Sequence, residues 1–349
     1  MEGTRIPIRN VYYMLSYAFQ ALRQKEYRSL EAEEFSHVHD LLAAVLCVGI
    51  SRQLKQGLYR EYIEHSEELQ TLRGRINMGG TIAARLAHRR SVACTFDELS
   101  ADNALNQAIK ATCLLLLRHG NVAQERKRSL RKELLLMQDV SEVDPRGIKW
   151  SDFRGHRGNQ NILMLLSVCQ MVAEGMLLTS RNGEFRLAEF VDDQRLYHLY
   201  EKFVLNYFAR EHPEVKASSP HIQWATDDGA LAMLPTMRSD IMLSQGDREL
   251  IIDAKYYGTT MQSNYGTLTI RSDHLYQIFT YVKNRDASFG DVPHKVSGML
   301  LYARTNESVQ PNQTYHLSGN RVDARTLDLN RDFPEIAAQL DGIVSEFFD

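Results

Sequence analysis

Apolar residues recur along this chain at two spacings, and each spacing predicts a different kind of element. Apolar positions three and four residues apart, the pattern of amphipathic helices, occur in residues 11–22, 38–54, 104–119, 161–178 and 196–208. Residues 123–137 predict a further, strongly charged helix. Short continuous apolar runs, typical of buried strands, occupy residues 250–252 and 296–303. The order of these elements predicts an α/β protein (α+β overall) that is mainly helical in its first half.

Residues 58–78 depart from the helical pattern. This stretch, which contains Arg73-Gly74-Arg75, alternates in part between apolar and polar positions, as strands with one exposed face do. It predicts a β-rich protrusion from an otherwise helical region, and a hairpin is one form that such a protrusion can take.

The helical pattern breaks again near Ser180–Glu184, where Arg-Asn-Gly interrupts it. We therefore predict an N-terminal region of residues 1–183 and a second domain of residues 184–349. With 349 residues, the chain is long enough to form two or three hydrophobic cores.

The stretch Pro235–Tyr257 predicts a β-hairpin that carries candidate chemistry. An apolar run leads directly into Asp253 and Lys255, and Gln245–Asp247 supply a polar turn. Asp240, in the earlier strand, lies at the distance at which a hairpin folds back towards Asp253. Two carboxylates can hold a hard divalent cation, and a lysine on the same strand face can orient water or balance charge on a phosphate. Phosphodiester hydrolysis requires such a set.

The pattern of an acid, any residue and a lysine is not specific by itself. It also occurs at Glu125–Lys127 and at Glu214–Lys216. Only the copy at Asp253 follows a buried-strand run and has an earlier strand acid at hairpin distance. From the hairpin alone, an exposed turn with an ordinary solvated ion pair remains an alternative.

Predicted helices on either side of the hairpin add further polar groups. Glu201 lies beside the apolar stripe of residues 196–208. A helix that begins near Ser272 places Gln277 and Tyr281 four residues apart, and therefore on one face. The predicted order is helix, strand, strand, helix, strand, with acids or amides at matching places.

This order, with these residues, resembles the PD-(D/E)xK nuclease superfamily, and within it the McrC family, the nuclease subunits of McrBC modification-dependent restriction systems. The resemblance covers nearly the whole chain, through the stretches IPIRNVYYMLSYAF, LRGRI and LYQIFTY and the segment Asp240–Lys255. It implies that residues 184–349 form a restriction-endonuclease-like domain with a central mixed sheet flanked by helices. In the superfamily pattern, proline precedes the first acid. In this chain the residue before Asp240 is Ser239, and this departure concerns the local turn more than the chemistry.

The resemblance also implies a role for each candidate residue. Asp240 and Asp253 would be ligands of Mg²⁺, and Lys255 would be the catalytic lysine. Glu201 would be an auxiliary acid that contacts the metal or a water, and Gln277 would belong to the Q-x-x-x-Y element of some branches. The chain would then be an Mg²⁺-dependent endonuclease that acts on double-stranded DNA.

Chains of this family act with a partner, and the resemblance implies a hexamer of an McrB-like AAA+ GTPase. Residues 58–78 would contribute to partner binding by docking into the pore of that ring. None of the 20 glycines is followed by lysine, so the chain has no Walker A phosphate loop. GTP would therefore be bound by the partner subunit.

The predicted function is that of the endonuclease subunit of a GTP-dependent restriction complex. The complex would act on DNA with 5-methylcytosine-type modification, and this chain would also stimulate the GTPase. Two alternatives remain open: a non-cutting adaptor that activates a ring-shaped GTPase, and the nuclease subunit of a sequence-specific GTP-dependent system.

The net charge of -3 does not by itself indicate a nucleic-acid binder. Basic residues instead gather in three clusters, which can bind phosphates but are also typical of solvated helix faces. The clusters are Arg85, His88, Arg89 and Arg90; Arg126, Lys127, Arg128, Arg131 and Lys132; and Arg146, Lys149, Arg154, His156 and Arg157.

Several absences in the sequence predict a cytoplasmic protein. The chain has no apolar run of membrane-spanning length, and its first residues lack the layout of a signal peptide. Its four cysteines are scattered without the short paired spacing of a zinc knuckle or a disulfide framework. They are Cys47, Cys94, Cys113 and Cys169.

Overall fold

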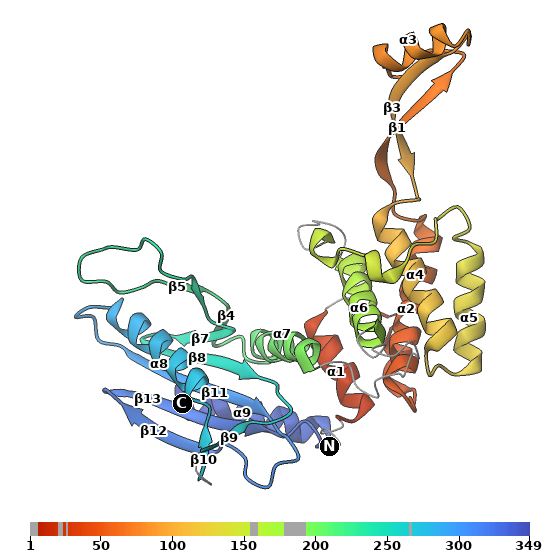
Figure 1. Ribbon diagram of the computed structural model, residues 1–349. Helices are drawn as coiled ribbons and strands as arrows, with labels where there is room; N and C mark the ends of the chain where they lie inside the picture. The colour runs from red at the N-terminus through yellow and green to blue at the C-terminus, as the bar shows by residue number, and fades with distance from the viewer. Residues whose placement is uncertain (1–5, 20–23, 26, 154–159, 178–192, 265–266) are drawn as a thin grey trace. The chain divides into compact units, whose positions relative to one another are not determined.

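A computed structural model describes residues 6–19, 24, 25, 27–153, 160–177, 193–264 and 267–349 (Figure 1). Contacts within the chain define two compact units. The first, which we call the sheet unit, consists of Met1–Val38 and Ala188–Asp349. The second, which we call the arm unit, consists of His39–Leu187.

A six-stranded sheet forms the centre of the sheet unit, in the order β12-β13-β11-β8-β7-β4. Strand β11 runs parallel to β8 and to β13, whereas the other neighbouring pairs are antiparallel. This mixed sheet and its flanking helices confirm the predicted α/β class. In sheet order, the strands span Gln313–Leu317, Asn320–Leu327, Lys295–Ala303, Arg248–Lys255, Ile241–Gln245 and Lys216–Ser218.

Helices and two small sheets surround this central sheet. The α-helices described in the unit are α1 Ile8–Ala18, α7 Asp193–Glu211, α8 Ser272–Ala287 and α9 Phe333–Phe348, with a 3-10 helix at Arg28–Ala32. The small sheets pair β5 His221–Ile222 with β6 Met237–Arg238, and β9 Met261–Asn264 with β10 Thr267–Ile270.

The two faces of the central sheet contact different helices. On one face, Ile251 of β8 and Leu300 of β11 pack in one core with Ile278 of α8. Side chains alternate between faces along a strand, and Arg248 of β8 lies on the opposite face, where Nη1 donates to Phe348 O of α9 at 3.0 Å. Helix α8 therefore covers the first face, and α9 lies against the second.

The close approach of α8 to β11 depends on a glycine. A Cβ at Gly298 would lie 2.7 Å from Val282 Cγ2 and 2.9 Å from Ile278 Cγ1, closer than side-chain atoms normally come. We expect Gly298→Ala to lower the free energy of unfolding by about 1–3 kcal/mol, because overpacking a filled core forces its neighbours to move. Urea unfolding followed by circular dichroism measures the change.

Gly342→Ala is the matched control for this prediction. Gly342 lies in α9, and a Cβ there meets nothing within 4 Å. Alanine favours the helix over glycine by about 0.8–1 kcal/mol, so this variant should be neutral or more stable. Equal stability of Gly298→Ala and the wild type would contradict the tight packing of α8 on β11.

Residues of the N-terminal segment pack within the sheet unit. Helix α1 lies along α7, and the hydroxyl of Tyr17 donates to Glu211 Oε1 at 2.8 Å. The buried Asn10 Nδ2 donates to Leu329 O at 2.8 Å, between β13 and α9. The first helix thus completes the unit that carries the central sheet.

This grouping differs from the domain division predicted from the sequence. The sequence assigns residues 1–38 to the N-terminal region, whereas contacts place them with the sheet unit. The predicted boundary at Ser180–Glu184 lies outside the described residues. The difference arises because a break in periodicity reports where an element ends, and not which core the preceding elements join.

The arm unit is built from helices close to those predicted. Figure 1 shows α2 Val38–Gln56, α4 Ala104–His119, α5 Gln124–Leu135 and α6 Gln160–Leu177. Two 3-10 helices follow α5, at Pro145–Gly147 and Trp150–Phe153. From the helices projects a structure that we call the arm, residues 61–100 (Figure 1).

The arm is a three-stranded antiparallel sheet with a helix at its end. Strand β1 Glu61–Leu69 pairs along its whole length with β3 Val92–Ser100, and the short β2 Arg75–Ile76 pairs with the other edge of β3. Helix α3 Met78–Leu86 connects β2 to β3. The predicted protrusion at residues 58–78 is therefore present but longer, because its main partner strand lies beyond α3.

The structure also bears on the state of the cysteines and on the apolar character of the helices. All four cysteines are free thiols in this structure. Burial raises the pKa of the Cys47 thiol to about 12, so it is protonated at neutral pH. Among the described helices, none has both the length and the apolar character needed to cross a bilayer.

Candidate active site

The two predicted aspartates meet where β7 and β8 lie side by side. Ile241 of β7 is the register partner of Ile252 in β8, which places Asp240 beside Asp253 one residue further along. The sequence predicted Asp240 within the first strand of the hairpin, whereas it lies immediately before β7. Its Oδ2 accepts a hydrogen bond from Ala254 N at 2.9 Å, which ties the acid to the neighbouring strand.

The predicted lysine shares a strand face with Asp253. Lys255 Nζ lies 2.7 Å from Asp253 Oδ2, and both side chains are buried. Across the face, Lys255 Nζ donates to Gln277 Oε1 of α8 at 3.0 Å, and Gln277 Nε2 donates to the hydroxyl of Tyr281 at 3.0 Å. The amide therefore fixes the lysine from the helix while the carboxylate fixes it from the strand.

Helix α7 adds the predicted glutamate. Glu201 lies close enough to Asp240 and Asp253 for its negative charge to raise the pKa of both. Its Oε2 is 3.2 Å from His198 Nδ1. The hydroxyl of Tyr197, one turn earlier on α7, hydrogen-bonds to Glu201, and burial with the nearby acids raises the pKa of that phenol. All five predicted site residues, together with Tyr281, are thus brought into one region.

Three acids, Asp240, Asp253 and Glu201, lie near one lysine, Lys255, and their mutual repulsion affects their protonation. Burial, with the charges of Asp253 and Glu201, raises the pKa of Asp240 to about 9. Burial also raises the pKa of Asp253, and the adjacent Lys255 ammonium opposes that shift. For Lys255, burial favours the neutral form, but the Asp253 carboxylate outweighs it and raises the lysine pKa. Lys255 is therefore a cation at neutral pH, while Asp240 retains a proton unless another cation replaces it.

These residues fit a divalent cation. Asp253 is buried, and apart from the ion pair with Lys255 neither of its oxygens has a well-aligned hydrogen bond within the described ranges. Asp240 keeps a proton that a cation could displace. In the described part of the chain, no three His, Cys, Asp or Glu side chains are placed to hold a metal ion together. Mg²⁺ is commonly held by only one or two carboxylates, with waters and substrate phosphates as the other ligands.

Two aromatic side chains outside the predicted set of site residues line the same region. The sequence places His274 beside the site, near the start of the helix that carries Gln277, but does not mark it as catalytic. His274 of α8 is buried, and its Nδ1 lies 3.0 Å from the hydroxyl of Tyr302 in β11. Burial and the Lys255 charge lower the pKa of His274 to about 4, so it is neutral at pH 7. The ring of Tyr257 stacks on His274 with centroids 5.2 Å apart. Only the position of Tyr257, two residues after Lys255, signals its closeness to the site.

The basic clusters belong to the arm unit. Arg89, from the first cluster, lies near the end of the arm and pairs with Glu68 at 2.9 Å. Arg126, from the second, pairs with the buried Asp40 at 3.3 Å. Of the third cluster, residues 154–157 lie outside the described residues. These pairings give Arg89 and Arg126 a structural role.

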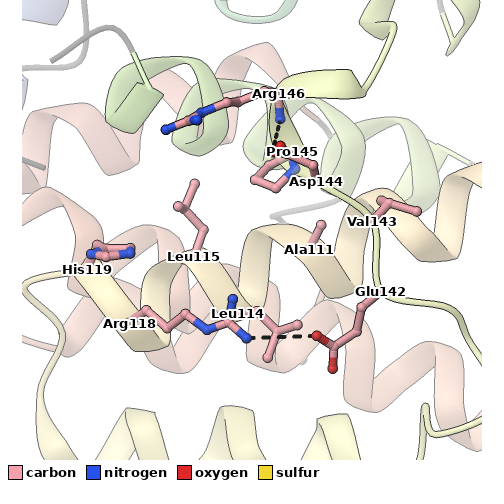
Figure 2. A pocket seen from close by; sticks show the side chains of 10 residues that line it. All are labelled: Ala111, Leu114, Leu115, Arg118, His119, Glu142, Val143, Asp144, Pro145 and Arg146. Atoms are coloured by element: carbon pink, nitrogen blue, oxygen red, sulfur yellow. Dashed lines mark hydrogen bonds and ion pairs between the residues drawn. The ribbon is translucent and has the colours of Figure 1, made fainter. Parts of the chain in front are cut away.

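A separate cavity in the arm unit holds none of the five candidate site residues, although Arg146 of the third basic cluster lines it. It measures about 240 Å³ and is lined by the end of α4 and by residues 142–146 (Figure 2). Figure 2 shows Arg118 directed towards Glu142, at 3.8 Å, and Asp144 Oδ1 accepts from Arg146 N at 2.9 Å. Because opposite charges alternate around its wall, the cavity lacks the convergent acids of a metal-dependent site.

Comparisons with known proteins agree with the resemblance predicted from the sequence. A family model described as "McrBC 5-methylcytosine restriction system component" matches residues 5–303. The Escherichia coli (strain K12) protein described as type IV methyl-directed restriction enzyme EcoKMcrBC is 28% identical over 355 aligned residues, which cover 99% of each chain.

Solved structures give a likeness of fold. A chain of the half-complex from the tetradecameric assembly of Thermococcus gammatolerans McrB AAA+ hexamers with bound McrC matches with a TM-score of 0.50 and 17% identity, over 97% of this chain and 76% of that chain. The cryo-EM structure of the Thermococcus gammatolerans McrBC complex matches more weakly, with a TM-score of 0.41 and 20% identity over 58% of each chain. The family match over most of the chain settles its membership. The protein belongs to the McrBC 5-methylcytosine restriction system component family.

Proposed function

We propose that this chain is the DNA-cleaving subunit of a GTP-dependent restriction complex that acts on DNA with 5-methylcytosine-type modification. The observation that carries the proposal is the meeting of Asp240, Asp253 and Lys255 on one face of the central sheet, with Glu201 and Gln277 supplied by helices on either side. Packing alone does not require a buried acid, a buried lysine and a second, partly buried acid at one point, because isolated buried charges are costly.

Each residue has a defined task in the proposed hydrolysis of a phosphodiester bond. Asp240 and Asp253 would hold Mg²⁺, which when bound polarises the phosphate and lowers the pKa of a water. Lys255, fixed between Asp253 and Gln277, presents a cation to the phosphate and orients the attacking water. Glu201 accepts a hydrogen bond from Tyr197 and adds negative charge that favours cation binding.

The arm supports a role in partner binding. Met78, Ile82 and Leu86 lie along one stripe of α3 and are 65%, 55% and 78% exposed. Exposed apolar patches of this kind mark interaction sites. A solved relative is described as McrC bound to McrB AAA+ hexamers, and we propose that the arm engages a hexameric GTPase of that type, which binds and hydrolyses GTP.

Cleavage of plasmid DNA by the reconstituted complex tests the proposed function. The chain and its GTPase, with GTP and Mg²⁺, should cut methylated plasmid and leave the unmethylated plasmid intact. Equal cutting of both plasmids would favour a sequence-specific system. Stimulated GTP turnover without any cutting would favour a non-cutting adaptor, and would contradict the proposal.

Metal binding can be tested without any cleavage. Millimolar Mg²⁺ is expected to raise the melting temperature of the full-length chain, because a ligand at ten times its Kd stabilises the folded state by about 1.4 kcal/mol, or about 3–6 °C for a domain of about 150–250 residues. Asp240→Asn should abolish the increase. Asp247→Asn, which changes an exposed acid in the turn between β7 and β8, should preserve it. An increase of the same size in Asp240→Asn would exclude Asp240 as a ligand.

The pH dependence of this stabilisation has a definite sign. Asp240 has a pKa of about 9 in the folded chain without metal, raised from 3.8. The protonated folded form is therefore favoured at low pH, and the metal-free chain loses stability as the pH rises from about 4 towards 9. Mg²⁺ must displace the same proton, so its stabilising effect should grow over the same range. Scanning fluorimetry at several pH values, with Mg²⁺ or with a chelator, measures both trends.

A further inference from the structure

One aromatic side chain beside the candidate site keeps a large exposed surface. Tyr257 is 38% exposed, whereas Asp253 and Lys255 are 1% and 3% exposed. It follows Lys255 by two residues along the backbone, immediately beyond the end of β8. An exposed tyrosine is therefore placed next to the buried charges on which the proposed reaction depends.

The ring of Tyr257 is held in place by partners that are themselves fixed. It stacks on His274 with centroids 5.2 Å apart and an interplanar angle of 23°. Its centroid also lies 6.2 Å from that of Tyr197, whose hydroxyl is hydrogen-bonded to Glu201. His274 is buried, and its Nδ1 is hydrogen-bonded to the Tyr302 hydroxyl at 3.0 Å. Because the supports come from α7, α8 and β11, the exposed part of the ring has a defined position relative to Lys255.

A nucleic-acid strand would meet this ring whenever a phosphate reaches the acids. Every phosphodiester has a deoxyribose on each side, so a phosphate bound near Lys255 brings a sugar to the neighbouring residues of the strand. The C–H face of a sugar is apolar and packs well on the face of an aromatic ring, whose electron density attracts weakly positive C–H groups. The bases of a duplex remain stacked on one another and do not offer a free face.

We propose that Tyr257 binds the deoxyribose next to the phosphate that reaches Asp240, Asp253 and Lys255, and thereby strengthens the binding of the DNA strand at the site. The inference rests on the proposed nuclease function and adds a substrate-binding residue to it. A contact with the sugar carries no sequence information. It therefore suits a subunit whose target is selected elsewhere in the complex.

Kinetics of the reconstituted complex separate this role from a structural one. Tyr257→Leu should raise the DNA concentration for half-maximal cleavage by about tenfold, near the lower end of the loss that follows removal of an aromatic ring stacked on a base. Its maximal rate should stay within about twofold of the wild type, since Lys255 and the acids are unchanged. Tyr257→Phe and Tyr257→Trp, which keep an aromatic face, should retain wild-type half-saturation.

An exposed tyrosine on α8 gives the matched control. Tyr276 is 68% exposed and precedes Gln277 in sequence, and Tyr276→Leu should leave half-saturation unchanged. The effect of Tyr257→Leu should be equal on AT-rich and GC-rich DNA. An unchanged half-saturation in Tyr257→Leu, or a lower maximal rate alone, would overturn the proposal. The same holds if the loss occurs equally in Tyr257→Phe, because the ring face would then not be the group that binds.

A binding measurement distinguishes failure of this inference from failure of the proposed function. Fluorescence anisotropy of a labelled DNA duplex is measured with the full-length Asp253→Asn chain and its GTPase, with and without Tyr257→Leu. About tenfold weaker binding in the double variant supports the sugar contact even if the wild-type complex never cuts DNA. Equal binding overturns the contact, whereas the nuclease proposal is judged by wild-type cleavage alone.

Discussion

Asp253→Asn is expected to lower the rate of DNA cleavage by about 10²–10³-fold or more, while stimulation of the partner GTPase persists. The substitution removes a carboxylate that both faces the proposed metal position and holds Lys255 Nζ at 2.7 Å. Loss of a single preorganised electrostatic group commonly costs a factor of this size in kcat. GTP turnover should persist because the arm, residues 61–100, belongs to the other compact unit. Plasmid cleavage and phosphate release, measured in one reaction, report both outcomes.

A buried lysine left without its carboxylate complicates that experiment. Breaking a buried ion pair by removing one partner can cost about 3–5 kcal/mol of stability. Among the described residues, Gln277 Oε1 would then be the remaining acceptor for Lys255 Nζ. The double variant Asp253→Asn/Lys255→Met removes both charges and avoids the unpaired ammonium. It should also be inactive in cleavage, with a melting temperature closer to the wild type.

Controls tie the loss of activity to the site. Asp247→Asn, at the exposed turn of the same hairpin, should cut DNA at the wild-type rate. Cleavage by a folded Asp253→Asn chain at a rate near that of the wild type would contradict the assignment of Asp253. If Asp253→Asn loses both GTPase stimulation and cleavage, the cause would instead be a general folding defect. In that case the double variant, which lacks the unpaired ammonium, should still stimulate the GTPase.

The part of the site that lies on the hairpin could be predicted because its signal is local. The apolar run before Asp253 fixes β8, and alternation along the strand places Lys255 on the same face. Ser239 stands where the nuclease pattern that the sequence resembles has proline, and the structure offers a local explanation. Its backbone N–H donates to Pro220 O at 3.2 Å, a bond that proline could not make, and Ser219 Oγ donates to Ser239 O at 2.7 Å. These bonds connect the strand segment before Asp240 to the residues around β5.

Other features could not be predicted because their partners are distant in sequence. The pairing of β1 with β3 skips 22 residues between Leu69 and Val92, so periodicity in residues 58–78 could not reveal it. The stacking of Tyr257 on His274, and of both against groups of α7 and β11, likewise depends on tertiary packing. An aromatic residue in a short apolar pattern is most often core, and nothing in the sequence marks Tyr257 as exposed.

Removal of the arm is expected to abolish stimulation of the partner GTPase, and with it GTP-dependent cleavage. The geometry of the arm allows a clean deletion. Glu61 and Ser100 are register partners at its base, and residues 63–98 can be replaced by a two-residue Asn-Gly hairpin turn. Tyr59 O, which accepts bonds from the side chains of Asn103 and Asn106 at the start of α4, stays in place. The helices of the arm unit therefore keep their connection.

Point substitutions identify which part of the arm makes the contact. Ile82→Asp/Leu86→Asp places two charges on the exposed apolar stripe of α3 and should lower stimulation of GTP turnover by about tenfold or more, because each charge would have to be buried against the partner. Leu135→Asp changes an equally exposed leucine on α5, 69% exposed, and should have no effect. Both variants need only circular dichroism to establish that the helices persist.

The outcomes separate three locations for the partner contact. Loss of stimulation in the deletion and in the α3 double variant, but not in Leu135→Asp, places the contact at the end of the arm. Loss in the deletion alone places it on the strands β1 and β3. Full stimulation by the deletion variant would contradict a role for the arm. The GTPase would then have to contact another surface of the chain, and the exposed apolar stripe of α3 would require a different occupant.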